Sequence, residues 1–150
     1  MRTYLVVIDE TPEARIALRF AARRAAKTGG AVELLAVIPP QEFVQWGGVQ
    51  AAMEEEARLR AEALVAAAAG EIVDEAGIRP AITVRHGEPI DVVRERLDSG
   101  DPVQALVLGA AGGGPGPLVA HFAGSIAGDL PCPLMIVPGS LSDEALDRLS

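Results

Sequence analysis

The sequence predicts an α/β protein in which a parallel sheet of five strands lies between two layers of helices, a three-layer sandwich. Five short apolar segments rich in β-branched residues recur along the chain, and segments with helical spacing separate them. Strands that alternate with helices pair in parallel through right-handed crossovers, which places helices on both faces of the sheet. The chain of 150 residues has the length of one domain.

The first strand and the first helix are predicted between Tyr4 and Gly30. Residues 4–8 are apolar on both faces, as a central parallel strand requires. Thr11 can cap the helix that follows, and Pro12 suits its first position. Gly29-Gly30 ends this helix. The residues expected to be buried on it are Ala14, Ala17, Leu18, Ala21 and Ala25.

Two strands and a long helix are predicted in the middle of the chain. Residues 32–38 form the second strand, which Pro39-Pro40 stops. A helix runs from Val49 to Gly77, and residues 81–85 alternate as a strand nearer the sheet edge does. The apolar stripe of the helix consists of Met53, Ala57, Ala61, Leu64, Ala68 and Ile72. Before it, Phe43 and Trp46 can cover a ligand or partner, or pack on the local helix.

The last third of the chain supplies two further strands. A helix with Ile90, Val93, Arg94 and Leu97 on one face precedes the fourth strand at residues 103–108. Residues 133–137 form the fifth strand. Residues 139–150 read as a polar C-terminal tail with a short helix from Ser142.

Composition argues against several classes of partner. The chain has 13 basic and 21 acidic residues, a net charge of −8, so most of its surface repels nucleic acid and anionic lipid. We therefore expect no nucleic-acid partner and no membrane. Cys132 is the single cysteine and cannot form an internal disulfide, and the N-terminus lacks the pattern of a signal peptide, which favours a cytoplasmic location.

Few residues suit metal binding or covalent catalysis. His86 and His121 lie far apart in sequence, and Cys132 stands between two prolines, so no metal site is expected. Ser125 lies in a helical stretch rather than in a G-x-S-x-G turn. We expect no catalytic residue.

A glycine-rich loop follows the fourth strand and is a candidate phosphate cradle. Residues 109–117 read Gly-Ala-Ala-Gly-Gly-Gly-Pro-Gly-Pro, and glycines let backbone N–H groups approach an anion closely. A helix beginning just afterwards adds its positive end. A plain tight connection is the alternative.

Asp9 is the second candidate, because it directly follows the first strand. Its carboxylate can accept a hydrogen bond from an adenine amino group or a ribose hydroxyl, or it can support the helix start at Thr11-Pro12. In an open parallel sheet a ligand sits at the carboxyl ends of the strands, where Asp9, Ile38 and Gly109 meet.

Several segments, in their order and spacing, resemble the universal stress protein family. They are Val6-Val7-Ile8-Asp9 with Thr11, Val84 with Gly87-Glu88-Pro89, the loop after Leu106-Val107-Leu108-Gly109, and Pro131-Cys132-Pro133 with Leu134-Met135-Ile136-Val137. The resemblance assigns residues 1–138 to one domain. It implies the adenine nucleotide alpha hydrolase-like fold, sheet order 3-2-1-4-5, and a homodimer through the strand at Leu134-Val137.

Members of the family that bind ATP carry the motif G-x2-G-x9-G-[ST]. Gly109 and Gly112 match its first half, whereas Gly124-Ser125 comes two residues late. A helix that began at Ser125 would leave about 7.5 Å of helix before Pro131, too short for a crossover. The helix is therefore expected to begin at Gly116-Pro117 and to contain Gly124 and Ser125.

The resemblance implies a stress-response sensor or scaffold that binds ATP or AMP and is not an enzyme. The residues expected to bind the nucleotide are Ile8, Asp9, Thr11, Val37, Gly109, Gly112, Gly114, Gly116 and Ser125. A dimeric interaction module of the same family that binds no nucleotide is the second hypothesis. An ATP-hydrolysing enzyme is a third, but it needs a water-activating base or a metal-binding pair near the loop, and the sequence offers neither.

Overall fold

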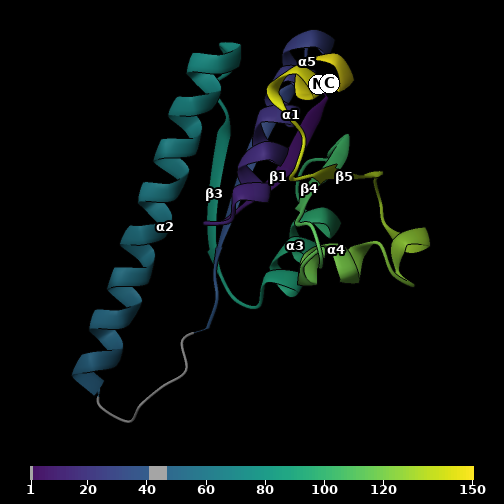
Figure 1. Cartoon of the computed structure of the whole chain (residues 1–150). Helices are drawn as coiled ribbons and strands as arrows, with labels where there is room; N and C mark the ends of the chain where they lie inside the picture. Colours follow the sequence, from purple (N-terminus) through teal and green to yellow (C-terminus); the bar gives the residue numbers. More distant parts are fainter. Residues whose placement is uncertain (1, 41–46) are drawn as a thin grey trace.

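The computed structural model describes residues 2–40 and 47–150, so Phe43 and Trp46 lie outside the described residues (Figure 1). The described chain forms a parallel five-stranded sheet in the order β3-β2-β1-β4-β5, which confirms the predicted topology. The strands are β1 (Thr3–Ile8), β2 (Ala31–Ile38), β3 (Ala81–His86), β4 (Ala105–Ala110) and β5 (Leu134–Pro138).

Helix α1 (Pro12–Thr28) begins and ends where its capping residues predict. The Thr11 hydroxyl accepts a hydrogen bond from the Ala14 amide at 3.3 Å, and Gly29 ends the helix in the left-handed conformation, with φ of 68°. The five predicted core residues are buried, and Ala22 joins them. Small alanine side chains let α1 lie close against the sheet.

Each face of the sheet carries its own core. Alternate residues of β1 point to opposite faces, so Val6 belongs to one cluster and Val7 to the other. Helices α1, α2 (Gly47–Ala76) and α5 (Asp143–Leu149) cover the Val6 face. Helices α3 (Pro89–Asp98) and α4 (Pro117–Phe122) cover the Val7 face. Among the helices described, none combines the length and apolarity that a membrane span needs.

The first half of α2 lacks the burial that its periodicity predicts. Ala68 and Ile72 are buried, but Met53 is 39% exposed. In Figure 1 the first turns of α2 stand clear of the sheet at the lower left. The prediction for Met53 is wrong because no strand or helix of the described chain faces that part of α2.

On α3 the buried residues are Val92, Val93 and Arg96, and Arg96 lies outside the face predicted from the sequence. Arg96 donates from Nε and Nη2 to the two carboxylate oxygens of Glu33 on β2, both at 2.8 Å. It also donates to the carbonyls of Ser99 and Asp101. Val93 of the predicted face is buried, and Ile90, Arg94 and Leu97 of that face are half-buried.

Helix α4 begins at Pro117 as predicted, but it ends at Phe122, so the expectation that it contains Gly124 and Ser125 is wrong. The Gly124 amide bonds to the His121 carbonyl at 3.2 Å, which tightens the last turn. The chain then passes through a 3₁₀ turn at Ala127–Asp129 toward β5. Turns and extended residues, rather than helix, complete this crossover.

Residues 139–150 carry the predicted short helix as α5, which packs on α1. The Ser142 hydroxyl accepts from the Ala145 amide at 3.2 Å and caps it. Leu146 is fully buried in the core cluster that contains Val6. Arg23 of α1 donates to the Asp143 carbonyl at 3.0 Å.

Candidate functional site

Two adjoining hollows lie at the carboxyl edge of the sheet, and Asp9 lines both. One has a volume of about 290 Å³ and lies between the ends of β1 and β2 and helix α2. The other has a volume of about 180 Å³ and lies between the start of α1 and the loop that connects β4 to α4. The parallel strands bring these segments together because all their carboxyl ends meet at this edge.

The larger of these two hollows has an apolar floor and a charged rim. Ile8, Ala36 and Val37 supply apolar wall from the strands. Asp9 and Arg60 carry charges at its edge. Three predicted binding residues, Ile8, Asp9 and Val37, therefore share one hollow, which can take a flat apolar group with a polar margin.

The smaller hollow lies beside the glycine loop. Of the predicted residues, it brings together Asp9, Thr11, Gly109 and Gly116. Glu13, a second acidic residue, also lines it. The remaining wall includes Pro89, Pro115 and Pro117, which have no backbone N–H to donate.

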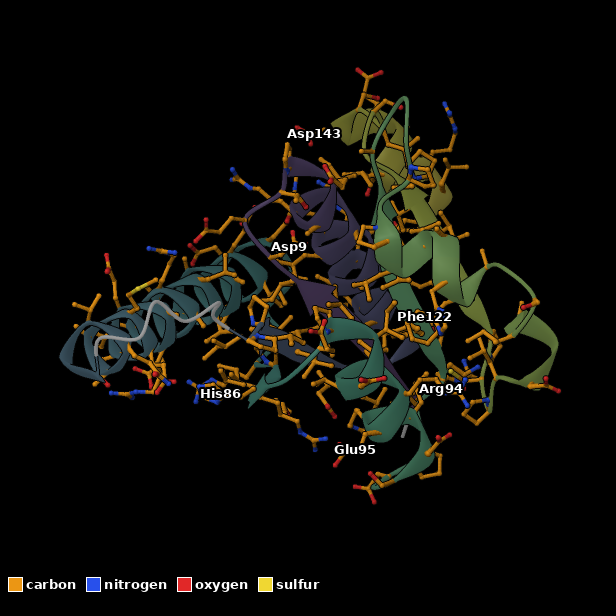
Figure 2. The ribbon with its side chains drawn as sticks, turned by 90° about the horizontal axis from the view of Figure 1, so that it is seen from below. Asp9, His86, Arg94, Glu95, Phe122 and Asp143 are labelled. Carbon is orange, nitrogen blue, oxygen red and sulfur yellow. The ribbon has the colours of Figure 1, made fainter. Side chains whose placement is uncertain are left out.

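The Asp9 carboxylate supports the start of α1. Its Oδ1 accepts hydrogen bonds from the Thr11 amide at 2.9 Å and from the Thr11 hydroxyl at 2.5 Å. The local interpretation of Asp9 is thus confirmed, and both bonds use the same oxygen. The residue is exposed, and Figure 2 shows it beside α1.

The fold requires some glycines of the β4–α4 segment and not others. A Cβ at Gly109 would lie 2.1 Å from the carbonyl oxygen of Glu13, so its glycine is explained by close packing of β4 on α1. Gly116 adopts φ of 91° at the start of α4. Added Cβ atoms at Gly112 and Gly114 would meet nothing within 4 Å, and neither residue has a positive φ. Within residues 2–40 and 47–150, nothing requires glycine at those two positions.

Three predicted residues line neither hollow. Gly112 and Gly114 are exposed on the loop, and Ser125 is exposed beyond the end of α4. The structure does not bring Ser125 to the carboxyl-edge hollows.

Charge at this edge is mainly acidic. Asp9, Glu10 and Glu13 line the two hollows, and Arg60 of α2 is the basic residue on their walls. Arg60 lies 3.9 Å from Glu10 and 3.7 Å from Glu56. Glu13 and Arg60 are not among the residues predicted from the sequence, because each occupies an ordinary polar position on a helix.

A third and wider hollow, of about 870 Å³, separates α1 from α2 and also reaches Asp9. Its arginines are engaged with acids of α2: Arg15 pairs with Glu71 at 2.9 Å, and Arg19 pairs with Glu75 at 2.9 Å. Burial acts to raise the pKa of Glu75, but hydrogen bonds from two arginines of α1 outweigh burial and lower it. These ion pairs join the two helices.

The described residues hold no cluster of three or more histidine, cysteine, aspartate or glutamate side chains suited to a metal ion. The two hollows at the carboxyl edge are lined by acidic residues, by glycines of the loop and by apolar side chains. Such an arrangement can bind a small polar molecule with an apolar ring.

Comparison with known proteins gives one family match and many matches of fold. The model of the Universal stress protein family matches residues 1–138. No curated protein matches the sequence. The solved structures that match have the same adenine nucleotide alpha hydrolase-like fold. Their sequence identities to this chain are low, so the likeness shows a shared fold and not a shared function.

Three solved structures illustrate the likeness. Universal stress protein UspA from Lactobacillus plantarum has a TM-score of 0.75 at 13% identity, over 91% of this chain and 97% of that one. A family protein from Arabidopsis thaliana, solved with AMP bound, has a TM-score of 0.63 at 14% identity, over 96% and 95%. The universal stress protein from Archaeoglobus fulgidus, solved in complex with dAMP, has a TM-score of 0.62 at 18% identity, over 91% and 97%.

Proposed function

This chain belongs to the universal stress protein family, and from that membership we propose that it binds an adenine nucleotide at the carboxyl edge of its sheet. Proteins of the same fold have been solved with AMP, dAMP and cAMP, which supports this ligand class. The observation that carries the proposal is the pair of adjoining hollows that meet at Asp9, one apolar and one beside the glycine loop.

The adenosine belongs in the hollow between β1 and β2. Ile8 and Val37 supply apolar surface for the base, and Asp9 has a second oxygen, Oδ2, outside its bonds to Thr11. That oxygen can accept a hydrogen bond from the adenine amino group or a ribose hydroxyl.

The phosphate end belongs beside the glycine loop. Gly112 and Gly114 have open space around them and no need of glycine for the fold, so a ligand that approaches the backbone closely would account for both. Gly109 and Gly116 shape the loop at its two ends.

We propose a sensor or scaffold rather than an enzyme, located in the cytoplasm and active in a stress response. Members of the family are generally non-catalytic, which supports binding without turnover. In such a protein, nucleotide occupancy changes which partner surface is stable, because a ligand favours the conformation that it binds.

We also propose that two copies pair through β5. This strand forms one edge of the sheet, and its Ile136 is 42% exposed. An open edge with apolar side chains favours pairing with another strand. Sedimentation at micromolar concentration should give the mass of two chains, and Ile136→Lys should shift it toward one. A single-chain mass for the unmodified protein would refute the pairing.

Calorimetric titration with AMP tests the nucleotide proposal. We expect saturable binding that Asp9→Ala and Gly112→Val weaken about tenfold or more, which corresponds to about 1.4 kcal/mol. Gly128→Val is the matched control, because Gly128 is also exposed with open space around it but lies in the turn before β5. Equal losses for the Gly112 and Gly128 variants would refute the assignment of the loop.

The second candidate is a dimeric interaction module that binds no nucleotide. Pro115 and Pro117 in the loop wall and the distance of Ser125 from the hollows favour it, since they reduce the donors available to phosphate. No binding of AMP or ATP at millimolar concentration would remove the first proposal and leave this one. Gly112→Val would then leave partner binding unchanged.

A further inference from the structure

This inference rests on the proposed nucleotide site and concerns which adenine nucleotides that site binds. We infer that the site accepts adenosine monophosphates and discriminates against the triphosphate, because the region that must hold the phosphates is acidic, small and poor in hydrogen-bond donors. Glu13 is the residue to which we assign much of this discrimination. Three independent observations support the inference.

The first observation is charge. Asp9 and Glu13 both line the hollow beside the loop, and among the described residues no lysine or arginine lines it. The sequence has no lysine or arginine anywhere from residue 97 to residue 147, which covers β4, the loop, α4 and β5. Residues 41–46 have none either. Each additional phosphoryl group would bring negative charge toward two acidic residues, without a lysine or arginine in the described wall of the same hollow.

Arg60 does not supply the missing positive charge in the hollow beside the loop. It lines the other hollow, beside the proposed adenosine position, and not the one beside the loop. It also lies within 4.0 Å of Glu10 and Glu56, at 3.9 and 3.7 Å. Its charge is therefore partly balanced before any ligand arrives.

The second observation is the shortage of donors. Three prolines, Pro89, Pro115 and Pro117, stand in the wall of the hollow and offer no N–H group. Helix α4 has only six residues, so its dipole adds little. Of the loop glycines, Gly109 and Gly116 line the hollow, whereas Gly112 and Gly114 are exposed outside it.

The third observation is size. The hollow beside the loop has a volume of about 180 Å³. Sites for whole small molecules usually measure about 300–1,000 Å³. The hollow therefore suits a single phosphoryl group better than a chain of three.

The test is calorimetric titration of the whole chain with AMP, ADP and ATP, each with Mg²⁺ and with a chelator. We expect affinity to fall in that order, with AMP binding about tenfold more tightly than ATP. ATP that binds as tightly as AMP in the chelator would overturn the inference. So would Mg-ATP that binds more tightly than AMP, because the carboxylates would then be holding a metal ion that carries the triphosphate.

Variants of Glu13 identify the cause. Glu13→Gln should raise the affinity for ATP about threefold, and Glu13→Lys about tenfold or more, with a smaller change for AMP. Glu95→Lys is the matched control for net charge, because Glu95 is exposed on α3 and Figure 2 shows it away from Asp9. Equal gains from the Glu13 and Glu95 lysine variants would refute a local effect.

The two proposals fail in different ways. If neither AMP nor ATP binds, the nucleotide function is wrong and the discrimination falls with it. If AMP binds and ATP binds equally well or better, the nucleotide function stands and only the discrimination is refuted. Thermal denaturation of each variant without ligand separates loss of binding from loss of folding.

Discussion

Replacing Gly109 with alanine should destabilise the fold strongly, although the residue lies in the glycine-rich stretch that resembles a phosphate cradle. The added Cβ would lie 2.1 Å from the carbonyl oxygen of Glu13 and 2.5 Å from its carbonyl carbon. The first distance is 1.3 Å shorter than the 3.4 Å at which ordinary contact begins. Both atoms are backbone, so β4 and α1 must move apart.

The expected cost follows from that geometry. Overpacking usually costs about 1–3 kcal/mol, and a clash between backbone segments that cannot change rotamer belongs at the upper end, about 3 kcal/mol. In a chain of 150 residues this lowers the midpoint of thermal unfolding by about 6–12 °C. Urea denaturation followed by circular dichroism measures the free energy of unfolding directly.

Gly112→Ala is the matched control, because a Cβ there meets nothing within 4 Å and the residue has no positive φ. It should leave the free energy of unfolding unchanged or raise it by about 0.4–1 kcal/mol, since alanine restricts the unfolded chain. A Gly109→Ala variant within about 0.5 kcal/mol of the unmodified protein would refute the reasoning. The alanine substitutions at Gly109 and Gly112 would then have similar effects on the free energy of unfolding.

Three further predictions concern ionisable groups. Arg96→Met should destabilise the chain by about 3–5 kcal/mol, because it leaves the carboxylate of Glu33 buried without its partner; adding Glu33→Gln should recover part of the loss in urea denaturation. The pKa of Glu75 is lowered, so its stabilising effect is complete above the unfolded value of about 4.3 and is lost as pH falls through the lower folded value. Glu75→Gln should flatten that part of the stability profile. Burial raises the pKa of the Cys132 thiol, so iodoacetamide should modify it more slowly at pH 7 than in urea.

Local signals determined the first third of the fold. Thr11 and Pro12 fixed the start of α1, and Gly29 fixed its end, because capping depends on residues within one turn of the helix end. The strand order and parallel pairing followed from the resemblance and the alternation of elements, and both are confirmed.

Sequence patterns were less informative where distant segments meet. The periodicity of α2 predicted a buried Met53, but burial depends on whether another element faces that turn. Helix α4 ends at Phe122 with Ala123 as its C-cap in the right-handed conformation, so no left-handed glycine marks this end in the sequence. Arg96 resembled any polar residue on α3, and only the sheet brings it to Glu33, which lies 63 positions earlier.

The candidate site shows the same division. The amino-acid sequence by itself predicted that Asp9, Ile38 and Gly109 would lie at one edge, since parallel strands place their carboxyl ends together. Only the tertiary structure decided that Gly109 is needed for packing against Glu13, that Gly112 is not, and that Ser125 lies elsewhere. The reason is physical: the type of residue and its neighbours in sequence set local conformation, whereas close approach and charge balance depend on atoms that the fold brings from far along the chain.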